Sequence, residues 1–199
     1  MYNSVRPFHH FTLQFMQLVI LDRDGVINYD SDEYIKSADE WKPIPGSLEA
    51  IARLNQGGYH VVLATNQSGL ARGLFTPDDL HQIHSKMLKQ LADIGGNIEA
   101  IFFCPHSQKD GCQCRKPRPG LFLDIANRLG TSLANVISIG DSLRDLQAAI
   151  AAGAKPMLVL TGNGKRTLNQ LEAFEDVPIF DNLAAVADFL LQNDENDKN

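Results

Sequence analysis

The feature that most constrains the fold is the alternation of short apolar, β-branched segments with longer segments of helical periodicity. This alternation is typical of parallel strands joined by right-handed helical crossovers, so it predicts an α/β protein with an open parallel sheet flanked by helices. Strands are predicted at residues 18–21, 60–64, 100–103, 136–139 and 157–160, and at a weaker edge candidate, 177–180. Caps and glycines place helices at residues 47–56, 77–93, 121–129, 143–152 and 183–191.

The chain of 199 residues contains no internal repeat or low-complexity linker, which predicts a single domain at residues 18–192. Residues 1–17 show no clear periodicity and are expected to form a poorly ordered extension. Residues 193–199 are too polar to bury anything and are expected to be a disordered tail.

Composition excludes several classes of function. The formal net charge is −6 without a cluster of Lys and Arg, so we expect no nucleic-acid partner. No apolar run approaches the roughly 20 residues of a membrane helix, and no secretory pattern opens the chain, so a cytoplasmic protein is expected. Without a heptad seam or an obvious apolar surface, a monomer is the default expectation.

Polar residues follow four of the predicted strands. The loops that leave the carboxyl ends of parallel strands gather at one edge of a sheet, and ligands bind there. The residues at these positions are Asp22 and Asp24, Thr65 and Asn66, Cys104 and His106, and Asp141.

The carboxylates at this edge are suited to phosphoryl transfer. Asp22 can attack phosphorus and form an acyl phosphate, while Asp24 can protonate the leaving oxygen and then deprotonate water. Asp22, the backbone carbonyl of Asp24 and Asp141 can supply the oxygen ligands of a magnesium ion. Thr65 and Lys116 can stabilise the transferring phosphoryl group. A lone Asp-x-Asp pair would more often be a solvated turn.

A second metal site is predicted from three cysteines and a histidine within eleven positions, 104–114. Cys104, His106, Cys112 and Cys114 form a Cys3His set, which suits a closed, structural zinc site. Such a site would fix the loop that leads into Arg115 and Lys116. The alternative is a loop of reduced, unliganded cysteines.

Together, LDRDG, ATN, the lysine of CRKP and GDSLRD resemble the four motifs of the haloacid dehalogenase superfamily, in the same order. The CPH…CxCRKP loop and TNQSGLARG resemble the D-glycero-D-manno-heptose 1,7-bisphosphate 7-phosphatase family, from about residue 18 to residue 190. The related histidinol-phosphate phosphatases share several of these motifs, including the spacing between His106 and Cys112, and they remain the alternative. The motifs SGLARG, CRKPRPG and TGNGK favour the heptose family.

The resemblance implies a magnesium-dependent phosphatase without a large cap domain, serving the synthesis of nucleotide-activated heptose for surface polysaccharide. It implies that Asp22 is the nucleophile, that Asp24 is the general acid/base, and that Arg115 recognises the distal phosphate of the substrate. Further substrate contacts are implied at Asp30, Ser31, Asp32, Glu33, Asn66, Gln67, Ser68 and Ser142. The resemblance does not indicate which anomer is preferred.

One alternative to an enzyme stays open at this point. A non-catalytic binding protein on the same fold is the alternative of another class, although the joint presence of Asp22, Asp24 and Lys116 favours an enzyme.

His81 and His84 lie three positions apart in the predicted helix 77–93, and we expect both to be exposed without a role.

Overall fold

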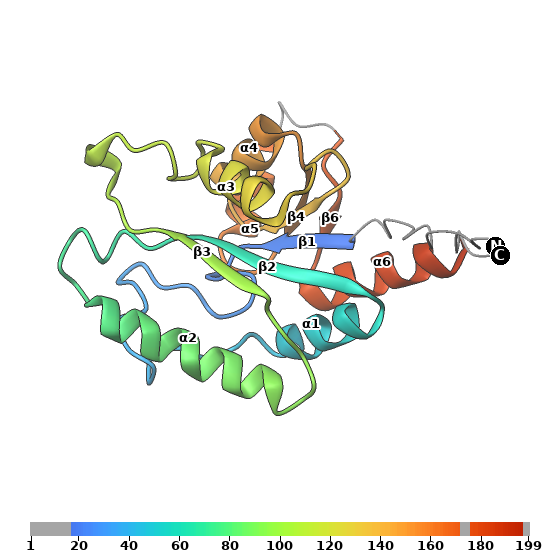
Figure 1. Cartoon of the computed structure of the whole chain (residues 1–199), viewed down its shortest axis with the longest axis horizontal. Coiled ribbons are helices and arrows are strands. Elements are labelled where there is room, and N and C mark those ends of the chain that lie inside the picture. Colours follow the sequence, from blue (N-terminus) through green and yellow to red (C-terminus); the bar gives the residue numbers. More distant parts are fainter. Residues whose placement is uncertain (1–16, 172–175, 197–199) are drawn as a thin grey trace, which may run out of the picture.

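The computed structural model of the protein describes residues 17–171 and 176–196. Its strands are β1 (Gln17–Leu21), β2 (Tyr59–Asn66), β3 (Ala100–Cys104), β4 (Ile137–Gly140), β5 (Lys155–Val159) and β6 (Ile179–Phe180). They form a parallel sheet in the order β3-β2-β1-β4-β5-β6, which lies at the centre of the molecule (Figure 1). The predicted class, an open parallel sheet flanked by helices, is confirmed.

Side chains of the central strand alternate between two apolar cores. Val19 and Leu21 point into one core, and Leu18 and Ile20 point into the other. Helices α1 (Ser47–Gln56), α2 (Pro77–Ala92) and α6 (Leu183–Asn196) cover the first face, whereas α3 (Gly120–Leu129) and α4 (Leu143–Ala152) cover the second (Figure 1). Residues 18–21 of β1 are buried and apolar without interruption, as expected for a central parallel strand.

The observed elements differ from the predicted ones mainly at their ends. Strand β2 continues through Asn66 because Thr65 and Asn66 still pair with β3, opposite Phe103 and Cys104. A short helix that the sequence did not predict, α5 (Gly164–Leu168), follows β5, and a 3-10 turn at Gln108–Asp110 lies in the cysteine loop.

Both terminal predictions need adjustment. Gln17 belongs to β1, so the extension is shorter than predicted by one residue, and residues 1–16 lie outside the described part of the chain. Helix α6 runs to Asn196, so residues 193–196 are helical rather than part of a disordered tail. The sequence after Leu191 contains no Gly or Pro that would end the helix. Residues 197–199 are not among the described residues.

No large cap domain interrupts the described chain. Residues 22–46, between β1 and α1, contain no helix or strand beyond two isolated bridges. Trp41 in this segment is fully buried and joins the core on the α1 and α2 side. In the part of the chain that the structure describes, no helix is long and apolar enough to cross a membrane.

Candidate functional site

The predicted catalytic residues meet at the carboxyl edge of the sheet, as the strand order requires. Strands β2, β1 and β4 are neighbours, and the backbone N–H of Asp22 donates a 3.0 Å hydrogen bond to the carbonyl of Ile139 in β4. A cavity of about 260 Å³ opens at this edge. It is lined by Asp22, Asp24, Asp30, Ser31, Asp32, Tyr34, Ile35, Thr65, Asn66, Gln67, Ser68, Arg115, Lys116, Arg144, Asn163 and Arg166.

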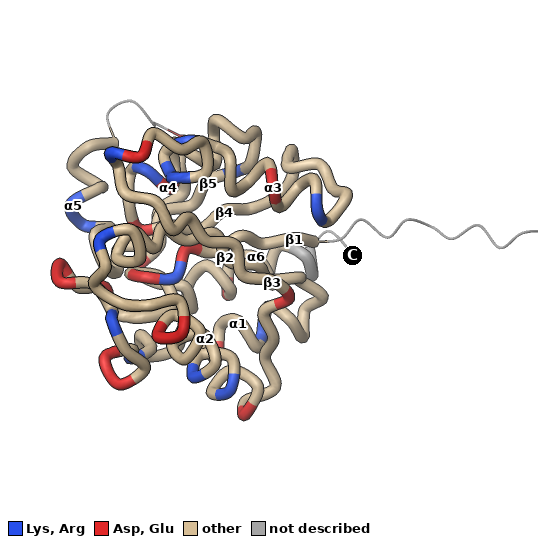
Figure 2. The backbone as a smooth tube through the Cα atoms, turned by 60° about the vertical axis from the view of Figure 1, so that its left-hand side comes forward, with Lys and Arg blue, Asp and Glu red and all other residues tan. Residues whose placement is uncertain are grey.

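Sequence reasoning and the structure differ over part of this lining. Glu33 and Ser142, both predicted substrate contacts, are not among the lining residues. Ser142 is buried and caps α4, with its hydroxyl on the Asp145 carboxylate. Arg144, which lies within the GDSLRD motif, and Arg166 also line the cavity, although neither was predicted as a site residue. Figure 2 shows acidic and basic residues side by side in the loops beyond the strand ends, a mixture that suits a site for both a cation and an anion.

Lys116 provides a buried positive charge at the centre of the site. Its Nζ lies 3.0 Å from Oδ1 of Asp22 and 2.6 Å from Oδ1 of Asp145, and it donates to the carbonyl of Ala64. Burial alone lowers the pKa of this amine, but the charges of Asp145 and Asp22 outweigh burial and raise it. Lys116 therefore stays protonated.

The backbone of Lys116 is held by one side chain of β2. Asn66 donates from Nδ2 to the Lys116 carbonyl and accepts the Lys116 N–H at Oδ1, both at 3.1 Å. This reciprocal pair resembles one rung of a β-ladder. It attaches the end of the cysteine loop to the sheet and fixes where the lysine side chain begins.

Three carboxylates, those of the partly buried Asp22 and of the buried Asp141 and Asp145, have oxygens within 4.8 Å of one another. Burial, reinforced by the neighbouring carboxylates, raises the pKa of Asp22 to about 6 against the opposing charge of Lys116. The same causes raise the pKa of Asp141 to about 8. Lys116 contacts both Asp145 and Asp22, so one positive charge faces three carboxylates, and a cation beside Asp22 and Asp141 would offset the remaining repulsion. These hard oxygen donors fit magnesium.

The position of Asp141 is set by the loop after β5. Asn163 donates to Oδ2 of Asp141 from its backbone N–H at 2.7 Å and from Nδ2 at 3.2 Å. Two glycines approach the same oxygen: a Cβ on Gly25 or on Gly162 would lie 2.1 or 2.2 Å from Oδ2. Both glycines have positive φ angles, 84° and 53°, a backbone conformation that other residues rarely adopt. Glycine is therefore needed at both positions, because of this conformation and because a side chain would collide with the Asp141 carboxylate.

The Asp24 carboxylate is held by three neighbouring side chains. Arg23 donates to both carboxylate oxygens from Nε and Nη2, at 2.9–3.0 Å. Asn28 and Gln67 each donate a further bond at 2.9 Å. Burial raises the pKa of Asp24, but Arg23 and these two amides outweigh it and lower the pKa below its usual value. Gln67 also donates to Thr65, which joins two predicted catalytic groups through one amide.

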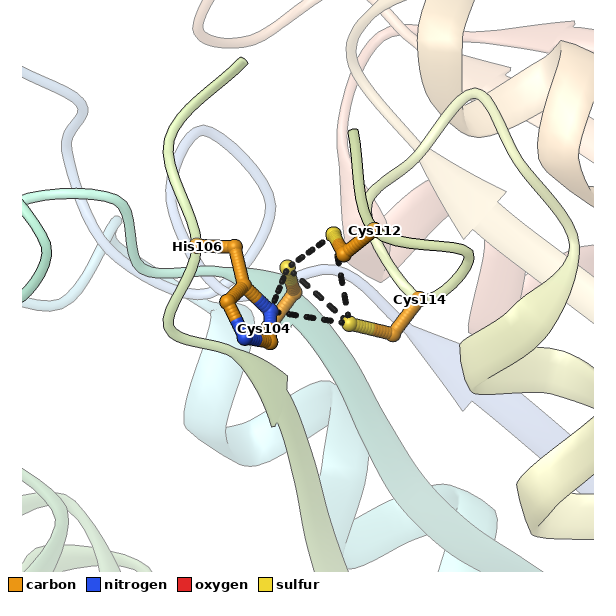
Figure 3. A group of neighbouring side chains, drawn as sticks. All are labelled: Cys104, His106, Cys112 and Cys114. Atoms are coloured by element: carbon orange, nitrogen blue, oxygen red, sulfur yellow. Dashed lines mark hydrogen bonds between the residues drawn. The ribbon is translucent and has the colours of Figure 1, made fainter. Parts of the chain in front are cut away.

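The three cysteines and the histidine of the loop converge (Figure 3). The sulfur atoms of Cys104, Cys112 and Cys114 lie 3.3–3.6 Å apart, and Nδ1 of His106 lies 3.3 Å from Cys114 and 3.7 Å from Cys104. Tetrahedral coordination with Zn–S bonds of about 2.3 Å places ligand atoms roughly 3.5–3.8 Å apart. The spacing of the four ligand atoms is close to that of a tetrahedral zinc site.

Comparison with family models matches the chain twice. Residues 17–148 match the family described as polynucleotide kinase 3 phosphatase, and residues 113–186 match the family described as HAD-hydrolase-like.

Comparison with curated relatives and solved structures is more specific. The D-glycero-β-D-manno-heptose-1,7-bisphosphate 7-phosphatase of Bordetella bronchiseptica is 59% identical over 89% of this chain and 99% of its own. The enzyme of the same name from Pseudomonas aeruginosa is 52% identical over 88% of this chain and 98% of its own. The crystal structure of the B. bronchiseptica D,D-heptose 1,7-bisphosphate phosphatase, complexed with magnesium and phosphate, matches at TM-score 0.88 and covers the same shares of both chains. That of the Burkholderia thailandensis phosphatase matches at TM-score 0.69 and 48% identity, over 87% of this chain and 98% of its own.

The geometry at Gly25 predicts that Gly25→Ala will disable metal binding. The new Cβ would strain the backbone and push Oδ2 of Asp141 out of place, so we expect magnesium-stimulated phosphatase activity to be lost. Gly130→Ala is the matched control, because Gly130 also has a positive φ of 62° but nothing within 4 Å of its Cβ position. The control should cost about 1 kcal/mol of stability and retain activity. Equal activity of the two variants would contradict the assignment.

The raised pKa values of Asp22 and Asp141 predict how magnesium stabilisation depends on pH. A carboxyl whose folded-state pKa is raised binds its proton more tightly in the fold, so the metal-free protein loses stability as pH rises from about 4 towards 8. Magnesium needs the ionised carboxylates, so the increase in Tm on adding it should be larger at pH 8 than at pH 6. Thermal denaturation at both values tests this, with Asp141→Asn expected to flatten the difference. An increment that is larger at pH 6 would overturn the interpretation.

Proposed function

The chain belongs to the D-glycero-β-D-manno-heptose-1,7-bisphosphate 7-phosphatases, magnesium-dependent phosphoric monoester hydrolases of the haloacid dehalogenase type, and from this membership we propose how its own residues perform the reaction. We propose that it removes the 7-phosphate of the β anomer of D-glycero-D-manno-heptose 1,7-bisphosphate through an aspartyl phosphate on Asp22. The observation that carries this proposal is the contact of the Asp22 carboxylate with the buried Lys116, in a cavity that three arginines also line.

In the first step, a carboxylate oxygen of Asp22 attacks phosphorus and the bond from phosphorus to O7 of the sugar breaks. Asp24 donates its proton to the departing O7. Its pKa is low in the free site, but the arriving phosphate brings negative charge that raises the pKa of a neighbouring carboxyl. Lys116 and the hydroxyl of Thr65 stabilise the charge on the phosphoryl oxygens.

In the second step, Asp24 takes a proton from water, which attacks the phosphorus of the aspartyl phosphate. The acyl phosphate bond breaks, phosphate leaves and the Asp22 carboxylate is restored. An Asp24 with a low pKa is well suited to this half of the reaction, because it is ionised and ready to accept the proton.

Asp22, Asp141 and the backbone carbonyl of Asp24 would hold the magnesium ion. When bound, magnesium neutralises the negative charge that the carboxylates and the phosphoryl group would otherwise bring together. Asp145 acts through Lys116, with which it forms the shorter of the two ion pairs.

Selection of the bisphosphate is assigned to the arginines of the cavity. Arg115 lines it and also lines an adjoining cavity of about 330 Å³, together with Arg118 and Arg144. The planar guanidinium binds phosphate in a bidentate manner, which supports Arg115 as the ligand of the 1-phosphate. Asp30, Ser31, Asp32, Asn66 and Ser68 line the same space, which supports contacts with sugar hydroxyls. A monomer in the cytoplasm is the state we propose; three free thiols support a reducing compartment.

Replacement of the nucleophile tests the covalent mechanism. We expect Asp22→Asn to lower kcat for the heptose bisphosphate by more than about a thousandfold, because an amide cannot form the acyl phosphate. Asp93→Asn, at the exposed end of α2, is the control and should behave as the wild type. Phosphate release from both anomers and from histidinol phosphate is measured in parallel. Preference for histidinol phosphate would keep the mechanism and replace the substrate; full activity of Asp22→Asn would end the covalent proposal.

We also propose that Cys104, His106, Cys112 and Cys114 hold a structural zinc ion. The convergence of four ligand atoms supports it. We expect about one zinc per chain by elemental analysis, and we expect Cys112→Ser to lower both the zinc content and Tm. Ser107→Ala, in the same loop but outside the ligand set, should keep the zinc. A metal-free wild type of unchanged stability would defeat this proposal.

A further inference from the structure

Arg23, between the two catalytic aspartates, is fully buried although it carries a charge. Each part of its guanidinium has a partner. Nε and Nη2 donate to Asp24, Nη2 also lies 3.2 Å from Oε1 of Gln67, and Nη1 lies 3.3 Å from Nε2 of His84. The guanidinium therefore engages both oxygens of the Asp24 carboxylate, and His84 contacts Nη1, the nitrogen that does not bond Asp24.

His84 comes from α2 and was expected to be exposed, but its relative exposure is 8%. The expectation was wrong because it considered the helix alone and not the loop that packs on it. His81, one turn earlier, is exposed as expected. The ring of His84 packs edge-on against Phe103 with centroids 6.3 Å apart.

The contact with Arg23 fixes the protonation state of His84. A guanidinium can only donate hydrogen bonds, so Nε2 of His84 must be the unprotonated acceptor and the ring must be neutral. Burial and the charge of Arg23 agree with this, since together they lower the pKa of His84 to about 4. Loss of this acceptor would leave a buried guanidinium N–H unpaired, which is costly enough to make the guanidinium turn towards another partner.

We propose that His84 is a positioning residue for the general acid: through Arg23, it fixes the Asp24 carboxylate in the orientation that reaches the leaving oxygen. This inference rests on the proposed function. A disturbed general acid has a specific kinetic consequence. An alkoxide such as the sugar O7 needs a proton as it leaves, whereas p-nitrophenolate leaves without one. The value of kcat/KM reports the steps up to the aspartyl phosphate, so it isolates this half of the reaction.

The test compares kcat/KM for the heptose bisphosphate with that for p-nitrophenyl phosphate in His84→Leu and His84→Gln. Leu cannot accept a hydrogen bond from Arg23, so we expect roughly a tenfold to hundredfold loss on the sugar phosphate and less than about a threefold loss on the aryl phosphate. Gln offers an acceptor oxygen and should restore most of the loss. Asp24→Asn should show the same split more strongly, and His81→Leu should show none. If His84→Leu does not fold, His84→Asn, whose amide is too short to reach Arg23, takes its place.

The outcomes separate the inference from the function on which it rests. An equal loss on both substrates would make His84 merely structural, and no loss would remove its role; either result overturns the inference alone. If the wild type hydrolyses the aryl phosphate but not the heptose bisphosphate, the proposed function fails and the inference fails with it. A loss confined to the sugar phosphate, with rescue by Gln, supports both.

Discussion

The ion pairs of Lys116 with Asp22 and Asp145 are the interaction on which the site depends. Three carboxylates crowd into a buried space, and each raises the cost of ionising the others. The positive charge of Lys116 offsets part of that cost even when no metal is bound. Asp145 keeps the lysine protonated and holds its amino group in position. The repulsion that Lys116 does not offset is seen in the raised pKa values of Asp22 and Asp141, and a bound cation would relieve it. The fold thus holds three carboxylates around a single lysine, and this arrangement determines which charged groups the site can accept.

The order of the strands brings the carboxylates together, and contacts in the loops fix their exact positions. Parallel strands bring three loops to one edge, but they do not by themselves set the positions of oxygen atoms. Two glycines leave the space that the Asp141 carboxylate occupies, and Asn163 binds one of its oxygens. One oxygen of Asp141 is thereby engaged by protein. The two glycines are thus as necessary to the site as the carboxylates are.

Much of this could be predicted from the sequence, because its main signals are local. Short, largely apolar runs followed by Asp22 or Asp141 predict buried strands with reactive ends, and the relatives and the observed sheet confirm the family and the fold class. The roles assigned to individual residues stay predictions. The environment of His84 could not be predicted, because its burial depends on a loop sixty residues away in the chain. The cap role of Ser142 was missed for a similar reason: a polar residue after a strand has the same pattern whether it binds a ligand or begins a helix.

The pairing of Asn66 with the backbone of Lys116 has a consequence for how such proteins can diverge. It attaches a loop residue to the sheet by two hydrogen bonds to its backbone that involve no other residue of the loop. The stretch between His106 and Cys112 can then change in length or sequence without displacing the lysine. Changes in that stretch would alter the wall of the adjoining cavity, which Ser107 and Gln108 line, and would leave the lysine beside Asp22 in place.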